Sequence, residues 1–143
     1  MREFYYSGPT AGAAVRRGAA KGGKVYADRD YTFTQLPDFL AGADYVQFPQ
    51  ADNQYSAVDL VVFTVKTDGV AYVAHDQRLP RPPWLKESFI DTGVTFPLPK
   101  ATLSIFKRAV RKDETLTLGS NVETQAKRAC TMYVVFVQSQ PGM

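Results

Sequence analysis

Four consecutive residues, His75-Asp76-Gln77-Arg78, have the side chains in this sequence that are best suited to acid–base chemistry. A histidine can act as a general base, and an arginine can neutralise the carboxylate of a sugar acid. Adjacent residues of a strand point to opposite faces, so His75 and Asp76 are poorly placed to touch each other. We therefore expect Asp76 to pair with Arg78 and with backbone groups where a strand ends.

A second group of residues has side chains that can bind a sugar. Trp84 is the single tryptophan of the chain and follows two prolines. The C–H face of a sugar ring stacks on an indole, so an exposed Trp84 would form a binding platform. The alternative is that Trp84 caps the core beside Leu85 and Phe89. The remaining candidates are the aromatic, amide and guanidinium side chains of Tyr45, Tyr55, Asn53 and Arg78.

The candidate metal ligands are Asp28 and Asp30, which precede an expected strand. Carboxylates at i and i+2 share a face and could hold a structural Ca²⁺ together with loop carbonyls. Arg29 lies between them, so a cluster of ion pairs is the alternative. One cysteine and one histidine exclude a zinc site built from several such residues, and we expect no other cofactor.

Length and composition indicate one globular domain. The 143 residues include 45% hydrophobic and 22% charged residues, with a net charge of +3 and a pI near 9.0. The basic residues are interrupted by apolar and acidic ones, so nucleic acid is not an expected partner. No run approaches the roughly 18 to 20 apolar residues of a membrane span, and residues 1–20 lack the apolar stretch of a signal peptide.

Residues 1–23 are expected to be a leader or linker, because alanine, glycine and basic residues dominate most of it. A short strand over Glu3–Tyr6 and a short helix over Ala11–Arg17 are alternatives within it. Residues 24–143 are expected to form the folded domain, with single helical turns over Leu36–Leu40 and Trp84–Phe89. The expected strands are Tyr31–Thr34, Ala43–Phe48, Leu60–Val65, Val70–Ala74, Val94–Phe96, Leu103–Ala109, Thr115–Leu118 and Met132–Val137.

Two of these strands flank Asp68-Gly69, which predicts a hairpin because Gly69 can adopt positive φ at no steric cost. The segment Val134–Val137 is apolar throughout and is expected at the centre of a sheet. Gly119-Ser120-Asn121 is typical of an ordinary turn. About eight short strands separated by turns predict an all-β fold, an antiparallel β-sandwich with jelly-roll-like connections.

The order of several short motifs carries a resemblance to a known class of domain. These motifs are Lys24–Phe33, Val73–Arg78, Pro83-Trp84-Leu85, Leu118–Asn121 and Met132-Tyr133. Together they resemble the β-sandwich accessory modules of secreted bacterial polysaccharide lyases and glycoside hydrolases. The resemblance implies an extracellular setting, a covalently attached catalytic domain in a parent protein, and polysaccharide binding or spacing as the role. The loop after Tyr45 is rich in Asn and Asp in those modules, and residues 48–54 keep part of that pattern.

Three hypotheses follow for the function. The first is a non-catalytic carbohydrate-binding module that targets an attached polysaccharide-degrading enzyme to its substrate. The second is a structural spacer without a ligand, and the exposure of Trp84 and Tyr55 separates the two. The third is a small lyase or hydrolase that uses His75 with Tyr72 or Tyr133. The fold alone would also suit a phage or capsid protein.

Overall fold

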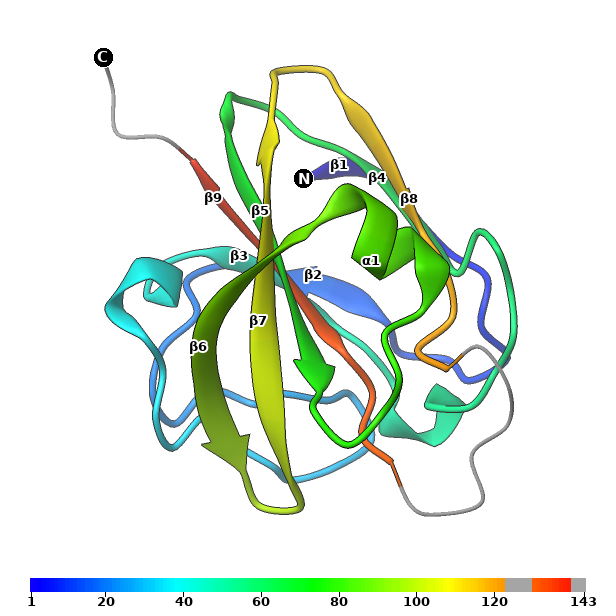
Figure 1. Ribbon diagram of the computed structural model, residues 1–143, viewed down its shortest axis with the longest axis vertical. Helices are drawn as coiled ribbons and strands as arrows, with labels where there is room; N and C mark the ends of the chain where they lie inside the picture. The colour runs from blue at the N-terminus through cyan, green and yellow to red at the C-terminus, as the bar shows by residue number, and fades with distance from the viewer. Residues whose placement is uncertain (123–129, 140–143) are drawn as a thin grey trace.

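The computed structural model describes residues 1–122 and 130–139, and its regular secondary structure is almost wholly β-strand, arranged in two antiparallel sheets (Figure 1). The smaller sheet has the order β1-β4-β8, with β1 at Arg2–Tyr6, β4 at Val61–Thr64 and β8 at Thr115–Leu118. The larger sheet has the order β2-β3-β9-β5-β7-β6; its strands are β2 (Ala14–Arg16), β3 (Asp44–Gln47), β5 (Gly69–Asp76), β6 (Ile90–Leu98), β7 (Ala101–Val110) and β9 (Val134–Ser139). The prediction of an all-β antiparallel sandwich is confirmed, with nine described strands where about eight were expected.

Among residues 1–122 and 130–139, helical structure is limited to three short segments. These are η1 (Asp38–Leu40), η2 (Gln50–Asp52) and α1 (Pro83–Ser88). The expected turns of helix at η1 and α1 are confirmed, and α1 begins with a proline, whose fixed φ suits the first turn. No helix in the described part of the chain is long and apolar enough to cross a membrane.

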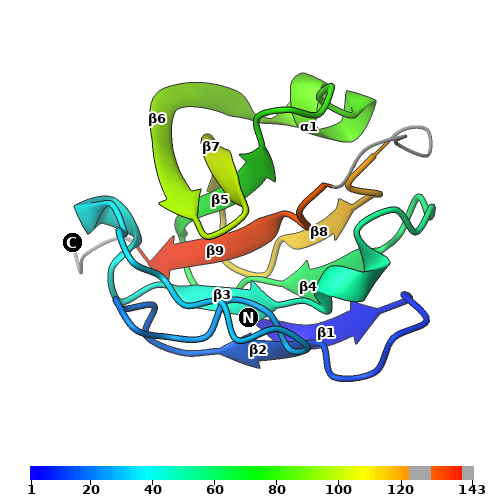
Figure 2. The same cartoon turned by 90° about the horizontal axis from the view of Figure 1, so that it is seen from below.

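The last strand, β9, lies between β3 and β5 and divides the core into two aromatic groups. Because side chains alternate along an extended chain, Tyr133 and Phe136 point to opposite faces. The Tyr133 ring packs against Phe48 and Trp84, each at 5.2 Å between ring centroids. The Phe136 ring instead packs against Phe33 and Tyr45, at 5.9 and 6.0 Å. Figure 2 shows β6 and β7 bent over β9 on one side and the smaller sheet on the other. The prediction that Val134–Val137 is central is therefore confirmed.

The predicted hairpin around Asp68-Gly69 is wrong, because β4 and β5 belong to different sheets. Asp68 accepts a hydrogen bond from the backbone N–H of Lys112, in the turn between β7 and β8, at 2.8 Å. A Cβ atom at Gly69 would lie 2.2 Å from the carbonyl oxygen of Gln138 in β9. Glycine is needed here for close approach of two backbones and not for a positive φ.

A tight hairpin between two long strands joins β6 to β7, where Leu98 pairs with Ala101. Strand β6 is an edge strand whose register shifts between Asp91 and Thr95. Gly93 has φ +77° at this irregularity, and Pro97 follows it in the strand. Bulges and prolines on an edge strand discourage pairing with other chains.

Residues 1–23 were expected to precede the folded domain, but they contribute two strands to the sheets. β1 pairs with β4, and β2 pairs with β3, with Arg16 opposite Tyr45. The Ala- and Gly-rich composition hid β2, since a three-residue edge strand is held by backbone hydrogen bonds and needs little apolar side-chain surface. The helix considered over Ala11–Arg17 is not formed, because this segment contains β2.

The strand expected at Tyr31–Thr34 is also not formed as such. Thr32 makes a single isolated bridge to Lys24. The backbone of Phe33 bonds to Gly22 and Gly23, so this segment closes a loop. The Phe33 side chain is nevertheless part of the core, because its ring packs against Tyr45 and Phe136.

Candidate functional site

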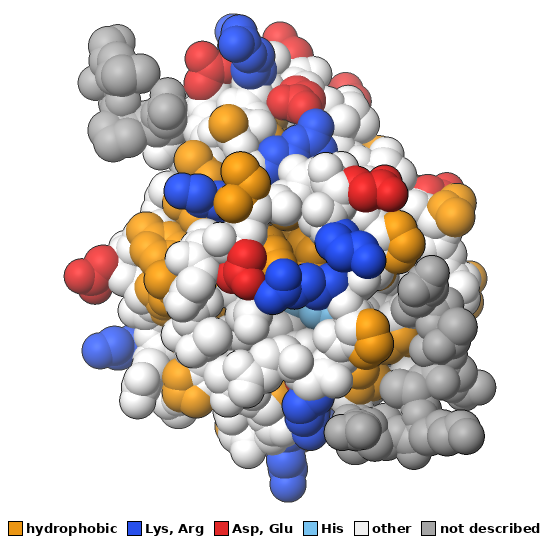
Figure 3. Space-filling model, in the orientation of Figure 1, with side chains coloured by type: hydrophobic (Ala, Val, Ile, Leu, Met, Phe, Trp, Pro, Cys, Tyr) orange, Lys and Arg blue, Asp and Glu red, His pale blue; other side chains and the backbone are white. Residues whose placement is uncertain are grey.

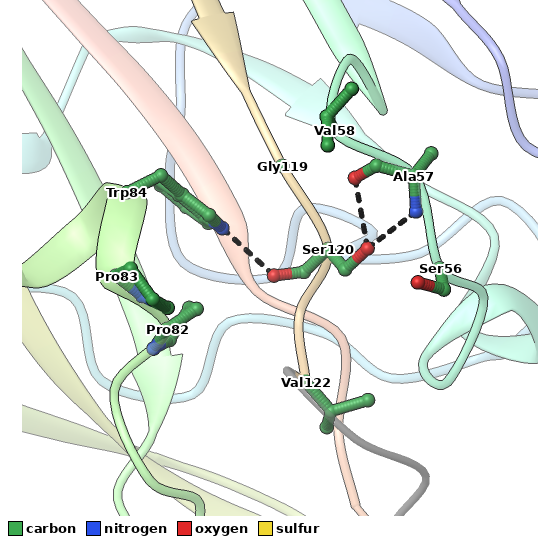
Figure 4. Close-up of a pocket in the computed structure, with 9 residues that line it drawn as sticks. All are labelled: Ser56, Ala57, Val58, Pro82, Pro83, Trp84, Gly119, Ser120 and Val122. Atoms are coloured by element: carbon green, nitrogen blue, oxygen red, sulfur yellow. Dashed lines mark hydrogen bonds between the residues drawn. The ribbon is translucent and has the colours of Figure 1, made fainter.

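An open pocket of about 310 Å³ lies between the start of α1, the loop before β4 and the residues after β8 (Figure 4). The described residues that line it are Ser56, Ala57, Val58, Pro82, Pro83, Trp84, Gly119, Ser120 and Val122. Small-molecule sites in proteins have volumes of about 300–1,000 Å³ and mainly apolar walls with a few polar groups. In size and lining, this pocket suits part of a small ligand.

Trp84 is the aromatic wall of the pocket and is half-buried. Its ring packs on the core side against Tyr133 at 5.2 Å and Phe89 at 6.3 Å between centroids. Its Nε1–H donates a hydrogen bond to the carbonyl oxygen of Ser120 at 2.9 Å. Trp84 therefore caps the core, as one of the two sequence interpretations expected, and it also lines a pocket.

Gly119 and Ser120 determine the shape of this pocket. A Cβ atom at Gly119 would lie 2.7 Å from Cδ1 of Trp84, so a side chain there would displace the indole. The hydroxyl of Ser120 accepts from the backbone N–H of Ala57 at 2.6 Å and donates to its carbonyl oxygen at 2.9 Å. Ser120 thus joins both walls of the pocket, a role that its place in a turn-like motif did not reveal.

Val58 and Tyr55 belong to the loop that forms the opposite wall. Val58 is 90% exposed and lines the pocket, although nothing in the residues around it had marked it as a candidate. Tyr55 is 37% exposed but is not among the residues that line the pocket. Of the two aromatic side chains expected to form a platform, the structure therefore places only Trp84 in the pocket.

Tyr45 lies far from this pocket in the architecture, on the face of β9 that carries Phe136. It is 5% exposed, and its hydroxyl donates to the carbonyl oxygen of Lys24 at 2.7 Å. A ring buried in this way offers no surface for stacking, so its proposed contact with sugar is corrected to a role in the core. Tyr45 was a candidate because of its aromatic ring, and the residue type alone does not reveal which face of the strand is covered.

Asn53 and Arg78 also make internal contacts. The side-chain oxygen of Asn53 accepts from the Cys130 thiol at 3.3 Å, and its backbone oxygen accepts from Asn121 at 3.0 Å. Arg78 donates through Nε and Nη2 to Asp76, at 3.0 and 2.7 Å. The expected pairing of Asp76 with Arg78 is confirmed. The five candidate sugar-binding residues are thus not gathered into one site.

Asp28 has a structural partner that its sequence position did not reveal. Its carboxylate accepts from the backbone N–H groups of Gln50 and Ala51 at 2.6 and 3.0 Å, at the start of η2. Asp30 is exposed. Within residues 1–122 and 130–139, no group of three or more His, Cys, Asp or Glu side chains is arranged to hold a metal ion. The Ca²⁺ site at Asp28 and Asp30 stays a prediction.

A set of buried polar side chains holds the extended segment Cys130–Tyr133, which leads into β9. Gln50 accepts from the N–H of Met132 at 2.8 Å and donates to the carbonyl of Cys130 at 2.9 Å. Asp76 accepts from the N–H of Thr131 at 3.0 Å. Asn121 donates to the carbonyl of Thr131 and accepts from the N–H of Tyr133, at 3.0 and 3.1 Å. These side chains satisfy backbone groups that a neighbouring strand would otherwise pair.

The same contacts explain the protonation behaviour of Asp76. Burial acts to raise the pKa of its carboxyl, which has 0% exposure. The hydrogen bonds and positive charge of Arg78, together with the bond from Thr131, outweigh burial and lower the pKa below its ordinary value. Asp76 is therefore a structural carboxylate that stays ionised near neutral pH.

His75 is 1% exposed, and its Nε2–H donates to the carbonyl oxygen of Asn121 at 2.9 Å. Burial lowers the pKa of His75, and the hydrogen bond to Asn121 and the charge of Asp76 only partly oppose this effect. The imidazole is therefore neutral in the folded protein at neutral pH. Tyr133 donates its hydroxyl to Gly119, and Tyr72 lies on the other face of β5 from His75. Among the described residues, His75, Tyr72 and Tyr133 therefore do not face one common groove, which a lyase built from them would need.

Folding lowers the pKa of His75. Over a range of pH, therefore, the unfolded chain binds a proton at His75 and the folded chain does not. Stability should fall as pH decreases below the unfolded value of about 6.5, by at most about 1.4 kcal/mol per pH unit for one proton. In His75→Gln, whose amide can still donate to Asn121, urea unfolding between pH 7.5 and 5 should show a smaller dependence on pH. An unchanged dependence in the variant would assign the effect to other groups.

Basic and acidic side chains are interspersed on the face that carries α1, β6 and β7 (Figure 3). Arg81 pairs with Asp91 at 2.7 Å, and its guanidinium lies 4.8 Å from the centroid of the Phe106 ring. Arg108 pairs with Glu114, also at 2.7 Å. Much of the basic character of this face is therefore balanced locally by carboxylates.

The fold is that of a small β-sandwich domain that carries a pocket. Comparisons with known proteins show that this domain is similar to part of a glycoside hydrolase. No family model matches the chain. The chain is 34% identical over 138 residues to a β-glucuronidase of Formosa agariphila, a match that covers 96% of the chain. It also matches the solved structure of a β-glucuronidase from glycoside hydrolase family 2, with a TM-score of 0.94, 34% identity and 98% of the chain covered.

The chain spans only 14% of the length of the Formosa enzyme and 15% of the chain in the solved structure. It therefore matches a small all-β portion of a much larger glycoside hydrolase. This confirms the part of the resemblance that linked the sequence to domains of glycoside hydrolases.

Proposed function

We propose that this chain is a non-catalytic carbohydrate-binding domain that holds an attached polysaccharide-degrading enzyme on its substrate, outside the cell. The observation that carries the proposal is the pocket walled by Trp84, whose position is set by Pro83 and by the bond to Ser120. An indole held in place in this way can stack on the C–H face of a sugar without losing side-chain freedom on binding. The match to part of a β-glucuronidase supports a glycan as the ligand and a catalytic domain as the covalent partner.

The expected affinity is modest. One aromatic wall and few free polar groups correspond to a dissociation constant on the order of micromolar to millimolar. Such affinity suits an accessory domain, because the attached enzyme must still move along its polymer.

Val58→Glu tests the proposal with little risk to folding, because Val58 is 90% exposed and lines the pocket. Affinity electrophoresis in gels containing plant, algal and microbial polysaccharides should show retardation of the unmodified domain by at least one polymer. We expect Val58→Glu to abolish this retardation, since a carboxylate would occupy the apolar wall. Val94→Glu, which adds the same charge on the exposed part of β6, is the matched control and should bind normally.

A structural spacer is the second candidate. It is favoured by the internal bonds of Tyr45, Asn53 and Arg78, which leave these side chains engaged within the domain. If no polymer in the panel retards the folded domain, the carbohydrate-binding function is wrong for those polymers and the spacer is preferred.

A further inference from the structure

The polar groups of the Trp84 pocket are already engaged within the protein. The indole N–H donates to Ser120 at 2.9 Å, and the Ser120 hydroxyl both accepts from and donates to the backbone of Ala57. Figure 4 shows these bonds running between the lining residues. A sugar hydroxyl that enters the pocket beside these groups would find few partners.

Apart from Ser56, the other described side chains of the lining are apolar. Val58, Pro82, Pro83 and Val122 carry only carbon atoms in their side chains, and the other hydroxyl among the described lining residues belongs to Ser56. Ser56 is exposed and lies at the end of the pocket away from Trp84 (Figure 4). The pocket therefore combines an apolar interior with one hydroxyl at its margin.

This distribution favours some sugars over others. Burying a hydroxyl without a partner weakens binding by about fivefold or more, whereas burying one methyl group strengthens it by about fourfold. A sugar that presents only hydroxyl groups gains little from such a pocket. A sugar that carries a methyl group can bury it against Trp84 and keep its hydroxyls in water.

We infer that the Trp84 pocket recognises a methyl group on a sugar, supplied either by an acetyl ester or by a 6-deoxyhexose. This inference rests on the proposed carbohydrate-binding function and specifies which sugars it selects. For an acetyl group, the carbonyl oxygen would also be able to accept a hydrogen bond from Ser56 at the margin.

The single tryptophan provides a direct measurement, because any change in indole emission reports on this pocket. The folded domain is titrated with acetylated xylan and with the same xylan after mild alkaline removal of its acetyl groups. A second pair, L-fucose and L-galactose, differs only by the hydroxyl at C6, so that only L-fucose carries a methyl group. We expect at least a fivefold lower Kd for the methyl-bearing member of one pair, and the pair that responds identifies the source of the methyl group.

A matched pair of variants separates this inference from a general loss of binding. Val58→Thr keeps the shape of the wall but replaces a methyl with a hydroxyl, so it should reduce the preference for the methyl-bearing member. Val94→Thr makes the same change on β6 and should keep the preference.

Equal Kd values within both pairs would overturn the inference while leaving carbohydrate binding intact. A lack of any change in Trp84 emission with all four probes would overturn it as well, and a lack of retardation in the polysaccharide panel would show that the proposed function fails with it.

Discussion

Asn121→Ala is expected to lower the free energy of unfolding by at least about 3 kcal/mol, because each buried polar group left unpaired costs about 1–3 kcal/mol. The Asn121 side chain is fully buried and makes three hydrogen bonds to backbone groups. The substitution leaves the carbonyl oxygens of Asn53 and Thr131 and the N–H of Tyr133 without these partners. A loss of this size is a large part of the roughly 5–15 kcal/mol that stabilises a typical domain.

The measurement is equilibrium unfolding in urea, with hydrogen exchange at the Tyr133 amide as a local probe. Gln77→Ala is the matched control, because it removes a similar amide side chain at an exposed position just after β5. The control should change stability by no more than about 0.5 kcal/mol. A loss below about 1 kcal/mol in Asn121→Ala would mean that water satisfies the three groups.

Gly69→Ala is expected to destabilise the domain by about 2–3 kcal/mol, near the upper end for overpacking substitutions. The new methyl group would lie 2.2 Å from the carbonyl oxygen of Gln138 and 3.1 Å from the Cα of Ser139. Both are backbone atoms of β9, so no change of rotamer can relieve the contact. The strands β5 and β9 must separate at this end, where Gly69 pairs with Ser139.

Thermal and urea unfolding measure this effect, and Lys66→Ala serves as the control because Lys66 is exposed in the same connection between sheets. If Asp68-Gly69 formed a tight hairpin turn with positive φ, Gly69→Ala would act through backbone strain and leave β9 unchanged. Hydrogen exchange distinguishes the two cases, since only the structure described above predicts faster exchange at the end of β9.

The elements that the sequence predicted well are those in which one local signal decides the structure. The alternation along Leu103–Ala109 predicted β7, the run Thr115–Leu118 predicted β8, and the helical turn expected over Trp84–Phe89 overlaps α1. The continuous apolar run of Val134–Val137 predicted a strand covered on both faces. In each case the pattern and the burial of the element have the same physical origin.

The elements that were mispredicted depend on partners distant in the sequence. Whether Gly69 bends a turn or fits against Gln138 is decided by β9, about half the chain away, and Asp68 alone cannot reveal it. The strand β2 is defined by backbone pairing with β3 and has almost no apolar pattern of its own. Local propensity describes neither case.

The candidate site could be predicted only in part, because it too depends on contacts between residues distant in the sequence. The alternative that Trp84 caps the core is confirmed, and the structure adds the pocket beside it. Ser120 and Val58 have ordinary types in ordinary loops, so only their contacts reveal them. Asp76 and Asn121 attract notice as polar residues, yet they act on the backbone of residues 131–133, a role that requires the folded chain.

The central position of β9 also constrains how the protein is made. During synthesis, β3 and β5 leave the ribosome long before β9, and neither can complete the larger sheet until that strand arrives between them. Until then, both strands have unpaired edges beside an incomplete core, which favours association with other chains. The domain should therefore fold only after its last strand has emerged. In a larger enzyme, nascent chains that end before Val134 should be recognised by chaperones, and those that extend well past Ser139 should be released.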